Sequence, residues 1–574
     1  MNNGLGVADY AVVVGFFVVM LAIGFYFSGR MKSLKDFFGG GHQVPWWVSG
    51  VSLYMSTFSA FAFVAYSATA YNDGMVAVAI WWSGVPCWLI SARVFAARWR
   101  RAASTSPLEF VETRYGPHLR QGLAWAGVPL IIIDDALKLF VIGTMVTVTL
   151  GVEGRGPLML GIAVCGSIML TYTFLGGLWA VMVTDFVQFV VMAAAVVVLI
   201  PLALIKVGGL EGFFSQTPQG FWAPTSENYT WFWLVAFLPI QFFSYSTRWS
   251  LVQRYYAVKS DVEARRVGYL VAALTFFGAP LLFLPAMAAR IFMPGVEDGN
   301  AVYALLCKQL LPVGMMGMVI AAMFSATMSM LSSDYNAVAS VITNDVYKRL
   351  FAPKASERAL VFVGRLATLS IGIVALGVAL LLASAPGAKD LVKIMASLFG
   401  VLLPPVAIPI IFGLLTRRVS NSAGVTAFLA GALCGVCAYG VSYVDDLAYL
   451  RDVRYLTWIT SVPALLAMVW SSIALPDNAD KRELVARFLA GLEGGKSLQE
   501  AEEPETSEAT ASSDAASTAI NIIGLAGAAM GALLIAAVVL TASINEGRLS
   551  ICVGAALLAA GLVAVGLARR LRAR

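Results

Sequence analysis

Long apolar segments separated by short polar loops make up most of the chain. Most of these segments reach the roughly 20 residues that an α-helix needs to cross the hydrocarbon core of a bilayer. They lack the short alternation of apolar and polar residues that is typical of strands in a membrane barrel. The pattern therefore predicts an all-α polytopic membrane protein with about fifteen spanning helices. We expect these spans near residues 8–28, 46–71, 76–97, 122–150, 157–174, 182–205, 231–252, 267–290, 312–340, 360–384, 391–415, 421–443, 455–475, 517–541 and 549–568.

The loops between the predicted spans alternate in charge. Basic residues gather in the loops that follow odd-numbered spans and at the end of the chain. They include Arg30, Lys32, Lys35, Arg98, Arg100, Arg101, Arg254, Lys259, Lys348, Arg349, Arg417, Arg418, Arg569 and Arg570. Because basic loops stay on the cytoplasmic side, we predict an external N-terminus and a cytoplasmic C-terminus. The first apolar run is followed by no small-residue cleavage site, so we expect it to be retained as a spanning helix.

Two predicted spans contain residues that interrupt helices. The span at 46–71 is rich in serine and threonine, and the span at 231–252 carries Pro239 followed by several polar residues. Proline frees a backbone carbonyl, and nearby hydroxyls can satisfy the groups that a break exposes. Interrupted helices in corresponding positions of two halves indicate the binding site of a secondary transporter. We therefore predict that spans two to six and seven to eleven form two inverted five-helix repeats, with the remaining helices as accessories.

This topology divides the chain into five parts. We expect a first accessory helix with a cytoplasmic loop at 1–45, an inverted-repeat transport core at 46–418, accessory helices at 419–475, a disordered cytoplasmic linker at 476–516 and a C-terminal accessory helix pair at 517–574. The linker is predicted to be disordered because much of it is acidic, rich in serine, alanine and threonine, and poor in large apolar residues.

Composition excludes most other classes of protein. The 574 residues are 59% hydrophobic and 13% charged, and their mean hydropathy is +0.80, which is incompatible with a water-soluble domain of this length. The net charge of +6 is distributed by side of the membrane, so we expect no nucleic-acid partner. Six cysteines, mostly in apolar segments, and two histidines indicate neither a disulfide framework nor a zinc site. The sequence contains no pairing of a nucleophile with a general base that would indicate an enzyme.

The segment 321–336 is a helix rich in serine within this apolar chain. Ser329, Ser332 and Ser333 have the i, i+3, i+4 spacing that places them on one helix face. Hydroxyl and carbonyl oxygens are hard donors that suit an alkali cation. The alternative is that small residues at this spacing let two membrane helices pack closely.

Several phrases along the chain resemble the sodium:solute symporter family, which has the inverted-repeat fold of the leucine transporter. The phrases are KDFFGGGHQVPWW (35–47), SPLEFVETRYG (106–116), TYTFLGGLWAVMVTDFVQ (171–188), QRYYAVKSDVEARR (253–266) and SATMSMLSSDYNAVASVITNDVYKR (325–349). The resemblance extends from about residue 5 to about residue 475, and the last two spans lie outside what the family requires.

The resemblance implies two sodium sites that share Ser329. The first would use the backbone carbonyls of Met55, Phe58 and Ala326 and the hydroxyl of Ser329. The chain departs from the family pattern at Met330, where serine or threonine is usual, because a thioether is a poor sodium ligand.

The second site would consist of Asp185, Ser329, Ser332 and Ser333. An alternative for Asp185 is a carboxylate that only stabilises a helix N-terminus. Asp334, next to Ser333, is a competitor for the acidic ligand.

Span 122–150 contains Asp134, Asp135 and Lys138, which are costly in a membrane unless they pair or line a cavity. Asp134 and Lys138 have the i, i+4 spacing of a helical salt bridge, so they could simply neutralise each other. The alternative is that Lys138 holds a substrate carboxylate, as a basic residue at the matching position does in sialic-acid-transporting relatives.

Other candidates for a substrate pocket are Ser56, Thr57, Ser59, Ala62, Trp81, Gln241 and Ser244. Gln241 matches a sugar-contacting asparagine in the galactose-transporting branch of the family. For Trp81, plain packing is the alternative.

These observations predict a sodium-coupled secondary active symporter. We expect it to import a small polar organic solute, carboxylate-bearing or similar to a sugar or polyol, across the cytoplasmic membrane by alternating access. The expected partners are the solute, sodium and the lipid bilayer, with no cofactor besides Na⁺ as the coupling ion; the sequence indicates no oligomeric state. The alternatives are a proton-coupled symporter that uses Asp185 and an uncoupled facilitator. A membrane sensor would need an output domain, which 476–516 is too short to form.

Overall fold

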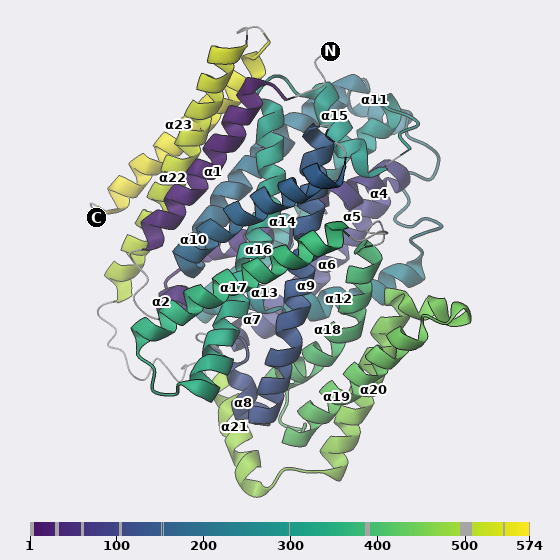
Figure 1. The fold of residues 1–574 in the computed structure, drawn as a ribbon, viewed down its shortest axis with the longest axis vertical. Helices are drawn as coiled ribbons and strands as arrows, with labels where there is room; N and C mark the ends of the chain where they lie inside the picture. Colours follow the sequence, from purple (N-terminus) through teal and green to yellow (C-terminus); the bar gives the residue numbers. More distant parts are fainter. Residues whose placement is uncertain are drawn as a thin grey trace.

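The computed structural model describes residues 5–28, 34–58, 62–102, 106–150, 152, 154–297, 299–384, 391–493, 508–542 and 546–572. Within these ranges the ordered elements are helices and there is no β-strand, which confirms the predicted all-α class. Figure 1 shows the helices packed side by side, with α16 at the centre and the pair α22 and α23 along one edge.

The first part of the chain combines short helices with two long ones. Its α-helices are α1 (Val7–Ser28), α2 (Leu34–Gly39), α3 (Trp46–Met55), α4 (Ser67–Asp73), α5 (Met75–Trp82), α6 (Gly84–Ile90), α7 (Ala96–Ala102), α8 (Glu109–Tyr115), α9 (Pro117–Leu150), α10 (Arg155–Lys206) and α11 (Gly209–Ser215). A 3₁₀-helix lies at η1 (Gly40–His42), and π-helices lie at η2 (Ala62–Tyr66) and η3 (Ser91–Phe95).

The second part continues with α12 (Trp231–Thr247), α13 (Trp249–Tyr256), α14 (Asp261–Phe292), α15 (Val302–Leu310), α16 (Met315–Val341), α17 (Glu357–Ser384), α18 (Leu391–Leu415), α19 (Asn421–Val441), α20 (Val453–Ala474), α21 (Ala479–Glu493), α22 (Glu508–Thr541) and α23 (Arg548–Arg572). The shorter elements are the 3₁₀-helices η4 (Gly299–Ala301) and η7 (Asp445–Arg451) and the π-helix η5 (Ile342–Phe351).

The predicted spans fall on these helices. Within the described residues, 10 helical stretches are long and apolar enough to cross a membrane, and shorter apolar helices lie at Arg155–Thr171 and Phe399–Leu415. The other predicted spans coincide with the broken pairs α3/α4 and α12/α13 and with α9, which carries Asp134, Asp135 and Lys138 in its apolar part. The number of crossings, about fifteen, stays a prediction.

The break predicted in span two is present. Helix α3 ends at Met55, and two hydroxyls satisfy carbonyls of its last turn: Ser56 Oγ donates to Ser52 O at 2.8 Å and Thr57 Oγ1 donates to Tyr54 O at 2.6 Å. The backbone N–H groups of Ser56 and Thr57 donate to the same two carbonyls, so each hydroxyl adds a second hydrogen bond at the end of the helix.

The break in span seven lies later than its proline suggests. Helix α12 continues through Pro239 to Thr247, and the chain becomes extended at Arg248 (φ −62°, ψ 127°) before α13 begins. Since proline removes only one donor, the helix tolerates it inside a packed bundle.

Gly177 separates the two predicted spans that α10 joins. Its backbone has φ 57° and ψ −167°, and a Cβ at this position would lie 3.0 Å from both Phe37 Cδ2 and Phe37 O. Only glycine adopts such a conformation without strain and still allows this close contact.

Helix α16 is the centre of the protein. The apolar part of Met315–Phe351, which includes α16, is 89% buried, whereas the apolar part of α19 is 22% buried. Helix α16 packs against α10, α1, α9 and α13. A helix buried on all sides places its polar residues inside the protein, where they need internal partners.

The predicted disorder of 476–516 is wrong for its first part. Residues Ala479–Glu493 form α21, whose apolar side chains Val485, Phe488, Leu489 and Leu492 are buried. The rings of Phe488 and Phe110 of α8 stack with centroids 6.3 Å apart. The amphipathic start of the segment therefore folds by packing one face on the transporter, and residues 494–507 lie outside the described part of the chain.

The last two helices pack against each other and against α1 (Figure 1). Glycines allow this close approach: a Cβ at Gly561 of α23 would lie 2.4 Å from Ala528 N and from Gly524 O of α22. Small residues at a helix interface let membrane helices pack backbone to backbone.

Candidate functional site

The break after α3 lies against the serine face of α16. Ser56 Oγ and Ser333 Oγ are 2.9 Å apart and hydrogen-bonded. Within α16, Ser333 Oγ donates to Ser329 O at 2.6 Å and Ser332 Oγ donates to the same carbonyl at 3.1 Å. The three predicted serines are buried, and at least Ser333 faces the broken helix.

Asp185 of α10 joins this group. Its side chain is fully buried, and Ser52 Oγ of α3 donates to its Oδ2 at 2.5 Å. Asp185 also lies beside Ser329. Within the described residues, Asp185 Oδ1 and Ser329 Oγ are buried atoms without a hydrogen bond of normal geometry. Two unpaired hard oxygens in a buried site are suited to a small cation.

Arg254 of α13 also lies in this site, and the sequence analysis missed it. Its side chain is fully buried; NH2 lies 3.4 Å from Asp185 Oδ2 and Nε donates to Ser52 Oγ at 3.1 Å. NH2 also donates to Ser333 Oγ. We counted Arg254 among the basic residues of a cytoplasmic loop, and that assignment is wrong because α13 places its side chain inside the protein.

The residues predicted for the first sodium site occupy the expected elements. Met55 is the last residue of α3, and Phe58 N donates to Met55 O at 3.0 Å across the break. Ala326 and Ser329 are fully buried in α16, which contacts α3. Met330 is partly buried in the same helix.

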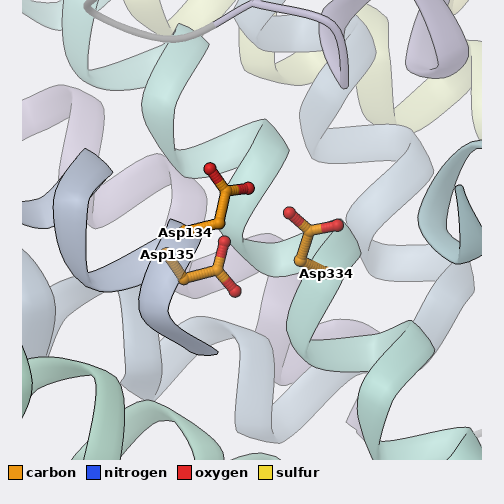
Figure 2. Close-up of side chains that lie close together, drawn as sticks. All are labelled: Asp134, Asp135 and Asp334. Carbon is orange, nitrogen blue, oxygen red and sulfur yellow. The ribbon is translucent and has the colours of Figure 1, made fainter. Parts of the chain in front are cut away.

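Three carboxylates, those of Asp134, Asp135 and Asp334, lie close together (Figure 2), and the ammonium group of Lys138 lies among them. Its Nζ lies 2.7 Å from Asp134 Oδ2, 2.9 Å from Asp135 Oδ1 and 2.9 Å from Asp334 Oδ2. Asp334 comes from α16, so the ammonium group joins α9 to the central helix. In this conformation the charge of Lys138 is neutralised by acidic side chains of the protein itself, which is one of the two interpretations that the sequence left open.

Arg248 completes the same group of charges. Its NH2 lies 2.6 Å from Asp134 Oδ2 and 2.6 Å from Asp334 Oδ2. The extended backbone between α12 and α13 allows its side chain to reach α9 and α16. Sequence analysis missed Arg248 because it follows the polar residues of a predicted span and carries no motif of its own.

The candidate substrate residues do not form a single group. Trp81 lies in an aromatic cluster, with its ring centroid 5.0 Å from Phe58, 5.1 Å from Tyr66 and 5.6 Å from Phe283. Gln241 contacts the residues on either side of Trp81 in the chain: Nε2 donates to Ile80 O at 3.2 Å, and Oε1 accepts from Ser83 Oγ at 3.2 Å.

The remaining candidates lie elsewhere. Ser56 is bonded to Ser333 and so lies next to the predicted sodium ligands, while the Thr57 hydroxyl donates to Tyr54 O within the turn after α3. Ser244 lines a small apolar hollow, which also has Thr247, Arg248, Phe399 and Leu403 in its wall. Ser59 lies outside the described residues, and the side chain of Ala62 is likewise not described.

The chain is similar to a known family and to known proteins. The model of the sodium:solute symporter family matches residues 37–435. The chain is 26% identical over 470 residues to the sodium/sialic acid symporter SiaT of Proteus mirabilis (strain HI4320), covering 78% of this chain and 92% of that protein. It is 25% identical over 542 residues to sodium/myo-inositol cotransporter 2 of Sus scrofa, covering 84% of this chain and 78% of that one.

A solved structure has the same fold. It is a Na⁺-coupled sialic acid symporter in a substrate-bound, outward-open state, with a TM-score of 0.73 and 23% sequence identity. The match covers 82% of this chain and 98% of the other. At this level of identity, the likeness establishes the fold and leaves the site to be argued from its residues.

Proposed function

We propose that this chain, which belongs to the sodium:solute symporter family, imports a small polar organic solute. It would do so by coupling entry of the solute to inward sodium flow. The observation that carries the proposal is the pair of neighbouring buried oxygens, Asp185 Oδ1 and Ser329 Oγ, which make no hydrogen bond of normal geometry to a described residue. They lie where the broken helix α3 contacts α16, which is the position that a cation needs to link two moving elements.

We assign a sodium site to Asp185, Ser329, Ser332 and Ser333. The carboxylate supplies the charge, and the serines supply hard hydroxyl oxygens. Arg254 already lies at Oδ2 of Asp185, so sodium and the guanidinium compete electrostatically for the same carboxylate. In this proposal, sodium binding weakens the Arg254 contact and thereby shifts α13 and α3 relative to α16.

Besides this site, we propose the first predicted sodium site, which consists of the carbonyls of Met55, Phe58 and Ala326 and the Ser329 hydroxyl. The free end of α3 supports it, because a helix C-terminus carries partial negative charge. Met330 would not contribute a ligand, since its thioether is a poor donor for sodium. Sharing Ser329 would make the two sites interdependent.

For the substrate we favour a sugar- or polyol-like solute. Gln241 and Ser83 offer neutral hydrogen-bonding groups at the backbone of Ile80, the residue before Trp81, and aromatic faces suit the apolar faces of such molecules. Lys138, which we had considered for a substrate carboxylate, has three carboxylates around it in this conformation. Its charge is therefore already compensated.

A carboxylate-bearing solute is the second candidate. Arg248 reaches the wall of the hollow that Ser244 lines. Its NH2 is paired with Asp134 and Asp334, so a substrate carboxylate would have to bind the other N–H groups of the guanidinium or displace these partners. The relatives differ in the same way: one is named for sialic acid and another for myo-inositol.

The sodium gradient supplies enough free energy for concentrative uptake. One sodium ion that enters across about 100 mV releases roughly 2.3 kcal/mol, and a tenfold concentration gradient adds about 1.4 kcal/mol. One ion per cycle would support roughly several-hundredfold accumulation of a neutral solute.

We place the protein in the cytoplasmic membrane with its N-terminus outside and its C-terminus inside. The basic loops after odd-numbered spans support this orientation. We assign alternating access to the core at 46–418 and an accessory role to the helices at 1–45, 419–475 and 517–574.

Uptake by purified protein in lipid vesicles tests this function. We expect an inward sodium gradient to drive accumulation of one member of a panel of sugars, polyols and sugar acids, and a potassium gradient to drive none. Accumulation driven by a pH gradient without sodium would show that protons, and not sodium ions, are the coupling ion. Equilibration without accumulation under either gradient would make the protein a facilitator.

A further inference from the structure

Five ionisable side chains form a closed group in the membrane-spanning region. We call Asp134, Asp135, Lys138, Arg248 and Asp334 the charge cluster. Each is at most 9% exposed, and Asp135 and Asp334 are fully buried. Ionisable groups inside a membrane are costly and generally have a function or a partner.

The charges of the cluster do not balance. Three carboxylates face one ammonium and one guanidinium, which leaves one negative charge in excess when all five groups are ionised. An uncompensated charge in a medium of low dielectric constant is strongly unfavourable. Arg254, whose charge also acts on Asp334, is already paired with Asp185. We therefore expect one further positive charge to bind to the cluster in this state.

The geometry favours a proton over a metal ion. One oxygen from each of the three carboxylates lies within 4.8 Å of the others, and a metal ion would sit at the centre of these oxygens. Lys138 Nζ occupies that centre, 2.7 to 2.9 Å from one oxygen of each carboxylate. A proton needs no such space because it binds directly to one oxygen.

Contacts within the cluster identify which carboxylate takes the proton. Asp134 and Asp334 each contact both Lys138 and Arg248, whereas Asp135 contacts Lys138 alone. Asp135 Oδ2 is buried and, among the described residues, has no hydrogen-bond partner. The carboxylate with the fewest cations around it and two acidic neighbours is the one that is least stable when ionised.

We propose that Asp135 is a proton-binding site, separate from the sodium ligands around Asp185. Its carboxylate takes up one proton from water, which makes the charge cluster neutral while Lys138, Asp134 and Asp334 hold α9 to α16. If α9 moved away from α16, Asp334 would lose its contact with Lys138. If α9 moved away from Arg248, Asp134 would lose its contact with Arg248. Either change would alter the affinity of Asp135 for its proton. Protonation of Asp135 is thus linked to the relative position of these helices.

Infrared spectroscopy of the full-length protein in lipid at neutral pH tests the site without knowledge of the substrate. We expect the wild type to have a carboxylic-acid C=O band that D135N lacks and that D135E retains at a shifted position. D185N should keep the band, because Asp185 is a different site. Loss of the band in D185N with its survival in D135N, or its absence from the wild type, would overturn the proposal.

Thermal stability gives an independent measurement on the same samples. Asparagine resembles a protonated aspartate in shape and charge, so D135N should melt at nearly the wild-type temperature. D334N is the matched control: it removes a partner of both Lys138 and Arg248 and should melt clearly lower. If D135N is destabilised as much as D334N, Asp135 is ionised and the inference is wrong. Neither readout depends on sodium-driven transport, so failure here leaves the proposed function standing.

Discussion

Ser329 is the residue on which the sodium proposal depends, because both proposed sites include it. Its Oγ is buried and makes no hydrogen bond of normal geometry to any described residue. A hydroxyl left in this condition costs stability unless a ligand uses it. Its removal should therefore affect ion binding more than folding.

We predict that Ser329→Ala weakens apparent sodium affinity by at least about tenfold, which corresponds to about 1.4 kcal/mol. The measurement is the sodium-dependent rise in melting temperature of the purified protein, because a ligand that binds only the folded state stabilises it. Without sodium, Ser329→Ala should melt near the wild type.

Ser325→Ala is the control for this experiment. Ser325 lies one turn earlier in α16, is also fully buried, and donates to Ala321 O at 2.6 Å. Its loss should leave sodium affinity unchanged. Equal sodium affinity in Ser329→Ala and the wild type would exclude Ser329 as a ligand.

At the scale of elements, breaks in helices are what bring the polar residues together. Arg248 and Arg254 lie on either side of the start of α13, and they reach Asp334 and Asp185 respectively. An unbroken helix over 231–256 could not project both side chains toward α16 at these places, because helical residues six apart lie on different faces. The break therefore creates two buried ion pairs.

The pair α22 and α23 illustrates packing by small residues. We predict that Gly561→Leu lowers the melting temperature and separates α23 from α22, because a Cβ at Gly561 would already overlap the backbone at Ala528. A cysteine pair engineered across the two helices would measure their separation through reduced cross-linking.

The same helix offers a control. Gly566 is exposed, and a Cβ there would meet nothing within 4 Å, so Gly566→Leu should leave the melting temperature and the cross-linking unchanged. Equal effects of the two substitutions would mean that α22 and α23 do not pack through their glycines.

At the scale of the whole molecule, the sidedness of the loops is the remaining prediction. We expect a tag at the N-terminus to be accessible to membrane-impermeant reagents in intact cells, and a tag at the C-terminus to be accessible only after the cells are opened. The basic loops favour this orientation because they resist transfer across the membrane. Two termini labelled from the same side would contradict the odd number of spans.

Local sequence was enough for many of the elements. The break after Met55 follows from the clustered hydroxyls of span two. The residues from Glu483 to Leu489 have the amphipathic pattern of the helix α21, although we predicted them to be part of a disordered linker. The pattern in α21 was masked by the acidic composition of the residues that follow, so disorder was predicted over too long a range. The break predicted near Pro239 lies at Arg248 instead. A proline in the sequence does not reveal how a packed bundle compensates for its missing donor.

What the sequence alone determined was the all-α membrane class, the approximate spans, the family and the serines of α16. These depend on hydrophobicity, helical periodicity and contiguous motifs, which are properties of neighbouring residues. Only the tertiary structure decided which charges meet: Arg254 with Asp185, and Lys138 and Arg248 with three carboxylates. These partners are far apart in sequence or lie across helix breaks, and the energy of a buried charge depends on where its partner lies in space.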